Sequence, residues 1–454
     1  SDRVMCVHLA AWQLGAVTVP LSVLYGRDGL AYRLADADPT VVVAESDKFD
    51  AVTKALSGVD TVELFAGTDA EPPALKGATT AAMDELTEGR RPQFEARATA
   101  PTDPAFILYT SGTTGRPKGV VQDHQTLLGW LPGFQMCFEL PWHDADPFLY
   151  ATPPLAWIGG INLVLGAWHY GFPVLVNDAV GGFDPVTVFE NLDRYGPTRA
   201  VLVPGMLKAM QQVDAAAYDL SSLTVVMSGS EPVSAALHEY VVETLGANLN
   251  EMYGQTEALH IVSSCSQWHD ADPGSLGYPV PGHEVAIIDE SGDRVSDDEV
   301  GIIGLEEPDP AMFAELWQDP EATAEKFIDG WMNTDDLGYR AEDGQFWFKS
   351  RADNLIITRG YRVGPAEVED SIIQLDAVED VAVVGVEGDD GGQIVKAYIV
   401  LEGGVSRTAE LKDRIRSHVK SNLAAYQYPR EIEFLDALPK TVTGKIQRHK
   451  LQDG

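Results

Sequence analysis

Short apolar runs alternate with segments of helical periodicity between about residues 100 and 230. The apolar runs are AFILYT, GFPVLV, TRAVLVPG and LTVVMSGS, and they are followed in turn by TLLGWLPGF, DPVTVFENLDRYG, MLKAMQQV and SAALHEYVVETLG. Runs of the first kind predict buried strands, and segments of the second kind predict helices. Strands and helices in alternation are typical of a largely parallel sheet covered by helices, so this region predicts an α/β fold.

The pattern changes twice further along the chain. From about 275 to 350, runs such as EVAIIDESGDRV and GQFWFKS are separated by Gly and Asp, which predicts antiparallel strands and turns. After Arg351, PAEVEDSIIQL predicts a helix, VEDVAVVGVEG and QIVKAYIVLEGG predict strands, and Thr408–Leu423 predicts a second helix. The apolar residues of this second helix recur every fourth position on one face: Leu411, Ile415, Val419 and Leu423. We therefore expect a large N-terminal domain over residues 1–352, with a β-rich subdomain at about 275–350, and a small α+β domain over residues 353–454.

The chain has 454 residues, too many for one ordinary core, and its 45% of hydrophobic and 22% of charged residues are typical of a globular protein. No run approaches the roughly 18 apolar residues of a membrane-spanning helix, and the first residues lack the basic start and cleavage site of a signal peptide. The three cysteines, Cys6, Cys137 and Cys265, lie far apart and form no CxxC pair. This spacing argues against a zinc or disulfide framework and favours a reduced, cytoplasmic compartment.

The formal net charge of −37 is the unusual feature of the composition. The 69 acidic residues outnumber the 32 basic ones and are spread along the whole chain, which indicates an acidic surface rather than an acidic tail. Salt of molar strength screens such self-repulsion within about 3 Å. We therefore favour a halophilic protein of a high-salt cytoplasm, and an ordinary acidic protein stays the alternative. So negative a surface argues against nucleic acid as a partner.

The segment Tyr109–Val120, YTSGTTGRPKGV, is the first candidate for chemistry. It follows a predicted strand, and its glycines let the main chain close on an anion, while its hydroxyl groups and one lysine offer hydrogen bonds. It does not fit the pattern of P-loop NTPases, because Gly119 rather than a hydroxyl residue follows Lys118, and it does not contain GxGxxG. By itself the segment is equally consistent with a surface turn.

Four further motifs follow along the chain: SGSEP at 228–232, YGQTE at 253–257, TDDLGY at 334–339 with SRADN at 350–354, and PKTVTGKIQR at 439–448. Together with the loop, and in the same order, they resemble the adenylate-forming (AMP-binding) superfamily, which comprises acyl- and aryl-CoA synthetases, peptide-synthetase adenylation domains and luciferases. The resemblance covers nearly the whole chain from about residue 5. It points to an AMP-forming acyl-CoA synthetase, similar to acetyl- and medium-chain acyl-CoA synthetases.

Enzymes of this family join a carboxylic acid to a thiol in two steps, so the resemblance implies a small carboxylic acid, ATP, Mg²⁺ and coenzyme A as ligands. The carboxylate attacks the α-phosphate of ATP and forms an acyl-adenylate and pyrophosphate, and the thiol of coenzyme A then displaces AMP. An ionised carboxylate needs no general base. The protein must instead neutralise charge on the phosphoryl oxygens and hold the reacting groups in line.

The resemblance assigns the glycine-rich loop to the β- and γ-phosphates of ATP. The loop residues with this role are Thr110, Ser111, Gly112, Thr113, Thr114, Gly115 and Lys118. Glu257 is expected to hold Mg²⁺, a hard cation suited to carboxylate and phosphate oxygens, and Thr256 is expected to donate a hydrogen bond to the α-phosphate. The alternative for Glu257 is one more acid on an acidic surface.

The resemblance also assigns the nucleoside site. The adenine would stack on the ring of Tyr253, next to Gly254, and Asp336 would accept hydrogen bonds from the ribose hydroxyls with help from Arg351. The other wall of the adenine site would be a turn of four residues: Gly229, Ser230, Glu231 and Pro232.

Two positions depart from the family pattern, which more often has glycine where this chain has Ser230 and usually has glycine where it has Asp335. The serine is a small change. If the main chain at residue 335 has φ > 0, aspartate is less favourable there than glycine. A second carboxylate beside Asp336 also adds repulsion near the nucleotide.

The C-terminal motif supplies the residue expected to catalyse adenylation. By the resemblance, Lys445 reaches from the small domain to the substrate carboxylate and the α-phosphate, which suits an ammonium on a flexible stem. Its alternative is a solvated lysine in a locally basic segment. Asp353 falls where the family has its hinge, and Gly360 and Arg362 match the strand that lines the thiol channel. The small domain would swing about Asp353 between the two reactions.

Trp157 and Gly254 fall where the family lines its acyl pocket. No acidic residue lies between Thr152 and Leu165 to pair with a substrate ammonium, which argues against an amino acid as substrate. Acetate-restricted relatives have tryptophan at the position of Gly254, so glycine is expected to leave room, and each buried methylene adds about 0.8 kcal/mol of binding free energy. A medium-chain or branched fatty acid, or an aryl acid, is therefore expected rather than acetate.

Three alternatives stay open. The acyl group could pass to the phosphopantetheine of a carrier protein, the substrate could be an aryl acid, or the chain could be a non-catalytic sensor of adenylates or acyl-CoA with the same fold. Pyrophosphate release that depends on the acid excludes the sensor, and AMP release with free coenzyme A excludes the carrier protein. The sequence does not indicate an oligomeric state.

Overall fold

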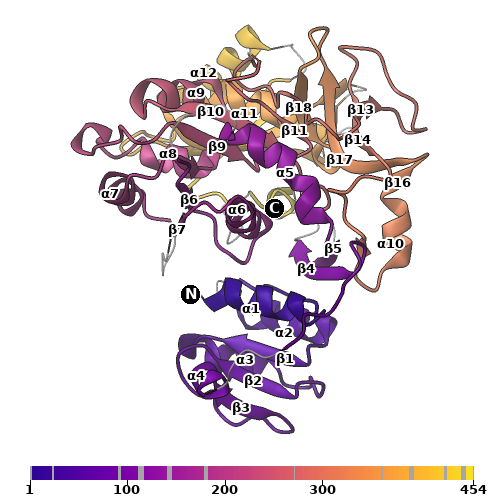
Figure 1. Ribbon diagram of the computed structural model, residues 1–454. Coiled ribbons are helices and arrows are strands. Elements are labelled where there is room, and N and C mark those ends of the chain that lie inside the picture. The colour runs from indigo at the N-terminus through magenta and orange to yellow at the C-terminus, as the bar shows by residue number, and fades with distance from the viewer. Residues whose placement is uncertain are drawn as a thin grey trace.

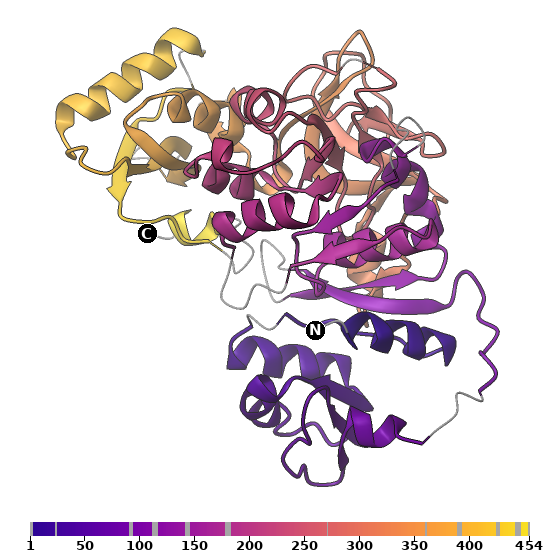
Figure 2. The ribbon, with the colours of Figure 1, turned by 60° about the vertical axis from the view of Figure 1, so that its left-hand side comes forward.

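The computed structural model describes residues 3–22, 25–89, 94–110, 117–140, 146–177, 183–269, 271–358, 361–387, 393–423, 427–440 and 446–452. Figures 1 and 2 both show an N-terminal lobe below a larger body, with helix α1 (Arg3–Gln13) on the side of the lobe that faces the body. The lobe contains a three-stranded parallel sheet: β1 (Val41–Ala44), β2 (Leu64–Gly67) and β3 (Thr79–Ala82). Its helices are α2 (Arg27–Ala37), α3 (Phe49–Ala55) and α4 (Met83–Thr87).

A seven-stranded sheet forms the main body. Its five parallel strands are, in spatial order, β7 (Val174–Val176), β6 (Leu149–Ala151), β8 (Arg199–Val201), β9 (Val225–Gly229) and β10 (Asn248–Tyr253). Two antiparallel strands extend it: β11 (Val262–Ser263) and β12 (Tyr278–Pro279). The intervening helices are α5 (Thr126–Cys137), α6 (Ile158–His169), α7 (Pro185–Tyr195), α8 (Pro204–Met210) and α9 (Ala235–Glu239). The alternation of strands and helices predicted from the sequence is confirmed here.

Helix α7 shows why the sequence folds in this way locally. Asp184 caps its start by accepting hydrogen bonds from the amides of Val186 and Thr187, and Pro185 occupies the first turn, where its missing N–H costs nothing. Gly196 ends the helix in the left-handed conformation, with φ 61°.

One strand does not lie where the alternation placed it. The run AFILYT forms β4 (Pro104–Thr110), which pairs antiparallel with β5 (Lys118–Asp123) instead of joining the parallel sheet. A parallel neighbour needs a crossover of about a dozen residues or more, and only residues 111–117 separate these strands. Strand β15 (Glu315–Leu316) completes this three-stranded sheet. The described residues on either side of the predicted phosphate loop, Thr110 and Lys118, are therefore paired with each other.

The β-rich subdomain is confirmed as an antiparallel sheet. Its strands are β13 (Val285–Ile288), β14 (Gly301–Glu306), β17 (Trp331–Arg340), β16 (Phe327–Ile328) and β18 (Phe346–Arg351). Helix α10 (Pro320–Glu325) lies between β15 and β16 in the chain, and Asp319 caps its start by accepting a hydrogen bond from the amide of Ala322.

The C-terminal part has the expected α+β composition. After the turn η5 (Ala352–Asn354) its elements are β19 (Ile356–Thr358), β20 (Tyr361–Val363), α11 (Pro365–Ile373), β21 (Val378–Glu387), β22 (Gln393–Leu401), α12 (Ala409–Asn422), β23 (Glu431–Leu435) and α13 (His449–Gln452). The predicted apolar face of α12 is confirmed, because Leu411, Ile415 and Val419 are buried in the core of this part. The domain boundary at residues 352/353 stays a prediction. Among the described residues, none of the helices combines the length and apolar character needed to cross a bilayer.

Candidate active site

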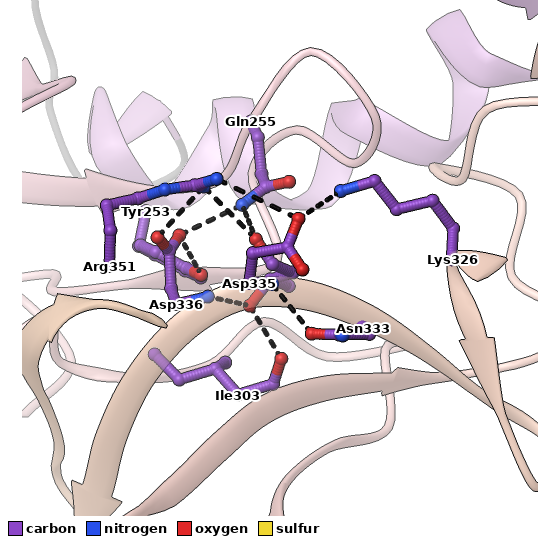
Figure 3. A network of polar contacts seen from close by, with 9 residues as sticks. Tyr253, Gln255, Ile303, Lys326, Asn333, Asp335, Asp336 and Arg351 are labelled. Carbon is purple, nitrogen blue, oxygen red and sulfur yellow. Dashed lines mark hydrogen bonds and ion pairs between the residues drawn. The ribbon is translucent and has the colours of Figure 1, made fainter. Parts of the chain in front are cut away.

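Two of the predicted nucleoside residues, Tyr253 and Asp336, lie far apart in the sequence and are in contact in the structure. Tyr253 ends the parallel strand β10, and Asp336 lies in the antiparallel strand β17. The Tyr253 hydroxyl donates a hydrogen bond of 2.8 Å to Asp336 Oδ2, and both residues are buried. Gln255 Nε2 donates to the same oxygen at 2.9 Å and to the carbonyl of Thr334 at 2.7 Å (Figure 3). The motifs YGQTE and TDDLGY are thus joined directly.

Arg351 reaches the same carboxylate from a neighbouring strand. Strand β18 pairs with β17 so that Arg351 lies opposite Asp336. One terminal nitrogen of Arg351, Nη1, donates to Asp336 Oδ1 at 3.1 Å and to the carbonyl of Thr334 at 3.2 Å. Asp336 therefore accepts hydrogen bonds from three side chains, two from YGQTE and one from SRADN.

Burial and charge act in opposite directions on this cluster. Burial raises the pKa of Asp336, while the Arg351 guanidinium and the hydrogen bonds of Tyr253 and Gln255 act to lower it. Burial also raises the pKa of Tyr253 well above its ordinary value, and the Asp336 carboxylate adds to this effect. Tyr253 therefore stays a neutral donor. Its hydroxyl is engaged with Asp336, which fixes the ring at the end of β10.

Asp335 has a left-handed backbone, with φ 58°, a conformation that is less favourable for aspartate than for glycine. Its carboxylate is paired, however. Lys326 Nζ lies 2.5 Å from Asp335 Oδ2, and Arg351 Nη2 lies 3.8 Å from the same oxygen (Figure 3). The Asp335 amide donates a hydrogen bond of 2.7 Å to the side chain of Asn333. The repulsion expected from a second carboxylate is thus offset by cations on two sides.

The turn expected to border the adenine follows β9, the strand next to β10. Gly229 pairs with Met252, and a side chain at Gly229 would begin 2.5 Å from the Met252 carbonyl oxygen, so only glycine fits there. Beyond it, Ser230, Glu231 and Pro232 are exposed, and Ser230 has φ 74°. The turn and the ring of Tyr253 therefore lie at the carboxyl ends of adjacent parallel strands, a common place for ligands in α/β folds.

A buried acidic residue, Glu251, is hydrogen-bonded to the main chain directly after this turn. Glu251 Oε2 accepts a hydrogen bond of 3.4 Å from the amide of Val233, directly after the turn. Burial raises the pKa of Glu251 to about 8, although hydrogen bonds from the amides of Val233 and Gly274 act to lower it. Sequence reasoning missed this residue. Its signal was an acid in the apolar pattern of strand β10.

The residues expected to bind phosphate and magnesium lie on connected elements, as far as the structure describes them. Thr110 and Lys118 are paired at the end of the β4–β5 hairpin, and Lys118 Nζ lies 3.6 Å from the Asp319 carboxylate. Gln122 of β5 donates a hydrogen bond to the carbonyl of Thr256. Strand β5 therefore connects the β4–β5 hairpin to the YGQTE loop. Residues Ser111, Gly112, Thr113, Thr114 and Gly115 lie outside the described residues.

Glu257 is half-buried, and its carbonyl accepts a hydrogen bond of 2.7 Å from the amide of Phe313, just before β15 pairs with β5. Within the described ranges, the structure contains no group of three or more His, Cys, Asp or Glu side chains that could hold a metal by themselves. A single carboxylate still fits Mg²⁺, because this ion commonly combines one or two protein carboxylates with phosphate oxygens and water.

The predicted C-terminal residues can be located only in part. Lys445 and Gly360 lie outside the described residues, as do the side chains of Asp353 and Arg362. The main chain of Asp353 lies in η5, directly after Arg351, and the main chain of Arg362 pairs with Ile357. Their roles stay predictions.

The acyl pocket differs from expectation at Gly254. A side chain there would begin 2.7 Å from the carbonyl oxygen of Ala258 and 2.8 Å from the amide nitrogen of His260. The loop main chain therefore fills the space that glycine was expected to leave open. Trp157 precedes the first turn of α6 and is half-buried.

His260, which sequence reasoning missed, connects this loop to helix α6. It is buried with φ 59°, and its Nε2 lies 3.0 Å from the Asn162 side-chain oxygen. Burial lowers the pKa of His260 to about 3, so the ring is neutral at ordinary pH. A buried polar pair thus holds the YGQTE loop against the helix that begins after Trp157.

Two known protein families match the sequence of this chain. Residues 1–314 match the family described as AMP-binding enzyme, and residues 367–445 match the AMP-binding enzyme C-terminal domain. The chain belongs to the AMP-binding enzyme family. The expected large α/β domain and small C-terminal domain of adenylate-forming enzymes are confirmed by these matches.

Individual AMP-binding enzymes are similar along nearly the whole chain. The uncharacterized acyl-CoA ligase YtcI of Bacillus subtilis (strain 168) is 33% identical over 98% of this chain and 82% of its own length. The acetyl-coenzyme A synthetase of the same organism is 30% identical over 100% of this chain and 78% of its own length. The crystal structure of the anthranilate CoA ligase AuaEII in complex with anthranoyl-AMP has a TM-score of 0.88 and 27% identity, over 99% of this chain and 85% of that chain.

The chain is thus an AMP-binding enzyme of the acyl-CoA ligase (AMP-forming) kind, with ATP and a carboxylic acid as the substrates typical of its family. The relatives named above act on different acids, since their names include acetyl and anthranilate. Family membership therefore identifies the reaction class and leaves the acid to be determined.

Proposed function

We propose that this enzyme converts a medium-chain or branched fatty acid to its acyl-CoA, using ATP and Mg²⁺ and releasing AMP and pyrophosphate. One observation carries the nucleotide part of this proposal. Tyr253, Asp336 and Arg351, from three separate segments of the chain, form one hydrogen-bonded cluster at the end of β10. The cluster combines an aromatic ring on which a base can stack and a buried carboxylate that can accept hydrogen bonds from ribose hydroxyls.

The nucleoside would bind with its base on the Tyr253 ring and its ribose hydroxyls on Asp336. A carboxylate has about four acceptor sites, and three side-chain hydrogen bonds occupy Asp336. One acceptor site is left for a ribose hydroxyl, and bifurcated hydrogen bonds would admit a second. Arg351 would keep the carboxylate ionised for this purpose.

The phosphates would extend from this site towards the β4–β5 hairpin. Lys118 has a half-exposed side chain and can turn from Asp319 to the β- and γ-phosphates. Glu257 would hold Mg²⁺, which supplies positive charge to the phosphoryl oxygens when it is bound. Thr110 and Thr256 would donate hydrogen bonds to phosphate oxygens. These groups stabilise charge and require no proton transfer.

In the first step, a carboxylate oxygen of the acid attacks the α-phosphorus of ATP, and the bond from this phosphorus to the bridging oxygen of pyrophosphate breaks. Lys445 is expected to stabilise the negative charge that develops on the acid and the α-phosphate in this transition state. In the second step, the sulfur of coenzyme A attacks the acyl carbon, the bond to the AMP oxygen breaks, and the thiol proton passes to solvent. Rotation about Asp353 would bring Gly360 and Arg362 to the thiol for this step.

The acid is the least constrained part of the proposal. Trp157 and the buried, apolar helix α6 favour an apolar acyl group, and the segment 152–165 contains no acid that could bind a substrate ammonium. Room beside Gly254 no longer supports a long chain, because main chain fills it. An aryl acid is the second candidate, because the anthranilate CoA ligase AuaEII is similar over 99% of this chain.

A panel of acids tests the proposal directly. Acetate, straight and branched acids of graded length, and benzoate are assayed for pyrophosphate and AMP release, with and without free coenzyme A, at low and molar salt. We expect acid-dependent pyrophosphate release, AMP release with free coenzyme A, and the highest kcat/KM for a medium or branched acid. Release of AMP only with a carrier protein, or no pyrophosphate with any acid, would contradict the proposal.

Lys445→Ala tests the assignment of the two half-reactions. We expect adenylation to fall by about a thousandfold or more, because the ammonium acts on charge that forms only in that transition state. Thioester formation from supplied acyl-adenylate should be retained. Lys450→Ala, an exposed lysine of the same segment, is the matched control and should leave both rates unchanged. Equal loss of both half-reactions in Lys445→Ala would contradict the assignment.

A further inference from the structure

Asp335 is the place where this chain departs most from its family pattern at the nucleotide site. Its backbone is left-handed, a conformation that glycine adopts without strain and that aspartate adopts less readily. An additional carboxylate next to Asp336 also opposes the binding of a polyanion. An unfavourable residue that persists in a binding site is expected to have partners that fix it there.

The partners of Asp335 connect it to both sides of the site. Lys326 Nζ lies 2.5 Å from its carboxylate, and the Lys326 side chain is largely buried, with 18% of its surface exposed. The main chain of Lys326 is fixed as well, because its carbonyl accepts a hydrogen bond of 2.7 Å from the amide of Asn333 in strand β17. The pair is therefore a defined contact between two fixed backbones rather than a loose surface ion pair.

Arg351 is held between the two adjacent carboxylates. Its Nη1 donates to Asp336, and its Nη2 lies 3.8 Å from Asp335 Oδ2 (Figure 3). Hydrogen bonds therefore hold Nη1, and the charge of Asp335 attracts Nη2, so the two carboxylates together favour one orientation of the guanidinium. Lys326 balances the charge that Asp335 adds, so the cluster contains two carboxylates and two cations.

We propose that Asp335 and Lys326 are positioning residues for the nucleotide. Asp335 attracts the second terminal nitrogen of Arg351, and Lys326 neutralises Asp335, so that Asp336 presents an ionised carboxylate to the ribose. The proposal rests on the proposed nucleotide site and goes beyond it, because neither residue is expected to touch ATP. It predicts that the two residues are energetically coupled and that their loss weakens nucleotide binding more than it slows catalysis.

The test uses four variants of the full chain: Lys326→Gln, Asp335→Gly, the double variant, and Lys326→Arg. We expect Lys326→Gln to raise the Kd for AMP and the KM for ATP about three- to tenfold, because Asp335 then loses its nearer cation and adds negative charge beside Asp336. Asp335→Gly should raise them by about threefold or less, because the attraction on Nη2 of Arg351 is lost while the negative charge beside Asp336 is removed as well. The double variant should resemble Asp335→Gly, and Lys326→Arg should restore wild-type binding. The KM for the acid and kcat should change less than twofold.

The control separates positioning from simple stability. Lys54→Gln breaks an ion pair of similar length, 2.6 Å to Asp50, in the N-terminal lobe, and should leave nucleotide binding unchanged. Calorimetric AMP binding and thermal unfolding are measured for every variant. Lower Tm with unchanged AMP binding in Lys326→Gln, or additive effects in the double variant, would overturn the proposal. If the wild-type protein binds AMP but releases no pyrophosphate with any acid, the proposed function fails, while the coupling of Lys326 and Asp335 is still measured by AMP binding.

Discussion

The turn at residues 229–232 and the irregular part of strand β17 at residues 333–336 border the proposed nucleotide site in different ways. Each contains a residue with left-handed backbone where the family pattern favours glycine: Ser230 has φ 74° and Asp335 has φ 58°. The Ser230 side chain is exposed and makes no hydrogen bond to any other described residue. The Asp335 side chain contacts two cations.

The comparison teaches that strained backbone alone does not mark a functional residue. The left-handed conformation costs a non-glycine residue about 1 kcal/mol at either position. At Asp335 this cost is offset by an ion pair and by the hydrogen bond from its amide to Asn333. At Ser230 no side-chain hydrogen bond or ion pair within the described part of the chain offsets it. The contacts of the side chain, rather than its φ angle, therefore distinguish the two positions.

The largest effect should come from Asp336, the neighbour that Asp335 supports. Asp336→Ala should lower kcat/KM for ATP by about 100-fold, because three side-chain donors lose their common acceptor and the ribose loses its own. Asp335→Ala should lower it by less than about tenfold, because its carboxylate acts only through Arg351. Pyrophosphate release at varied ATP measures both, with thermal unfolding as the control for folding. Equal losses in the two variants would break the distinction between a ligand contact and a positioning residue.

An effect of intermediate size, on the pH dependence of stability, should come from changing Glu251. This residue accepts a hydrogen bond from the amide of Val233, directly after the 229–232 turn. The folded protein keeps Glu251 protonated up to a pKa of about 8, whereas the unfolded chain ionises it near its ordinary value of 4.5. The folded state therefore binds the extra proton between these values, and stability falls as the pH rises through this interval. The slope from this group is at most about 1.4 kcal/mol per pH unit.

Glu251→Gln should remove this part of the pH dependence. Thermal unfolding between pH 5.5 and 7.5 should show a smaller decrease in Tm for the variant than for the wild-type protein. The difference between the two curves isolates Glu251 from the many other carboxylates of the chain. Parallel curves would show that Glu251 is already ionised in the folded protein.

The smallest effect, on the free energy of unfolding, should come from substituting glycine for Ser230 or Asp335. Ser230→Gly should raise the free energy of unfolding by about 0.5 to 1 kcal/mol, because strain is relieved and no contact is lost. Asp335→Gly should change it by less than about 0.5 kcal/mol, because the lost ion pair opposes the relief of strain. Chemical denaturation of both variants measures this. A larger gain for Asp335→Gly than for Ser230→Gly would reverse the comparison.

Much of the fold could be predicted because local patterns determined it. Alternating strands and helices predicted the parallel sheet, and the spacing of Leu411, Ile415 and Val419 predicted α12 and its buried face. The pairing of β4 could not be predicted from its composition, because a buried strand looks the same in a parallel and an antiparallel sheet. The short connection to β5 was the signal that decides it.

Residues of the candidate site that belong to recognisable motifs could be predicted. Residues whose role depends on contacts with distant parts of the chain could not. Tyr253, Asp336 and Arg351 were expected from their motifs, and the structure brings them together. Lys326 and Glu251 were missed because their importance depends on partners, and nothing in their local sequence indicates those partners. The closed space beside Gly254 was also missed, because it depends on the path of the loop up to His260.

Strand β18 ends at Arg351, and the chain enters the turn Ala352–Asn354 at the very next residue. If the C-terminal part rotates about Asp353 as proposed, the axis begins two residues from a guanidinium clamped by Asp336 and Thr334. A bound nucleoside would then restrain the residues on the N-terminal side of that axis. The hinge would therefore be more rigid with AMP bound than without it.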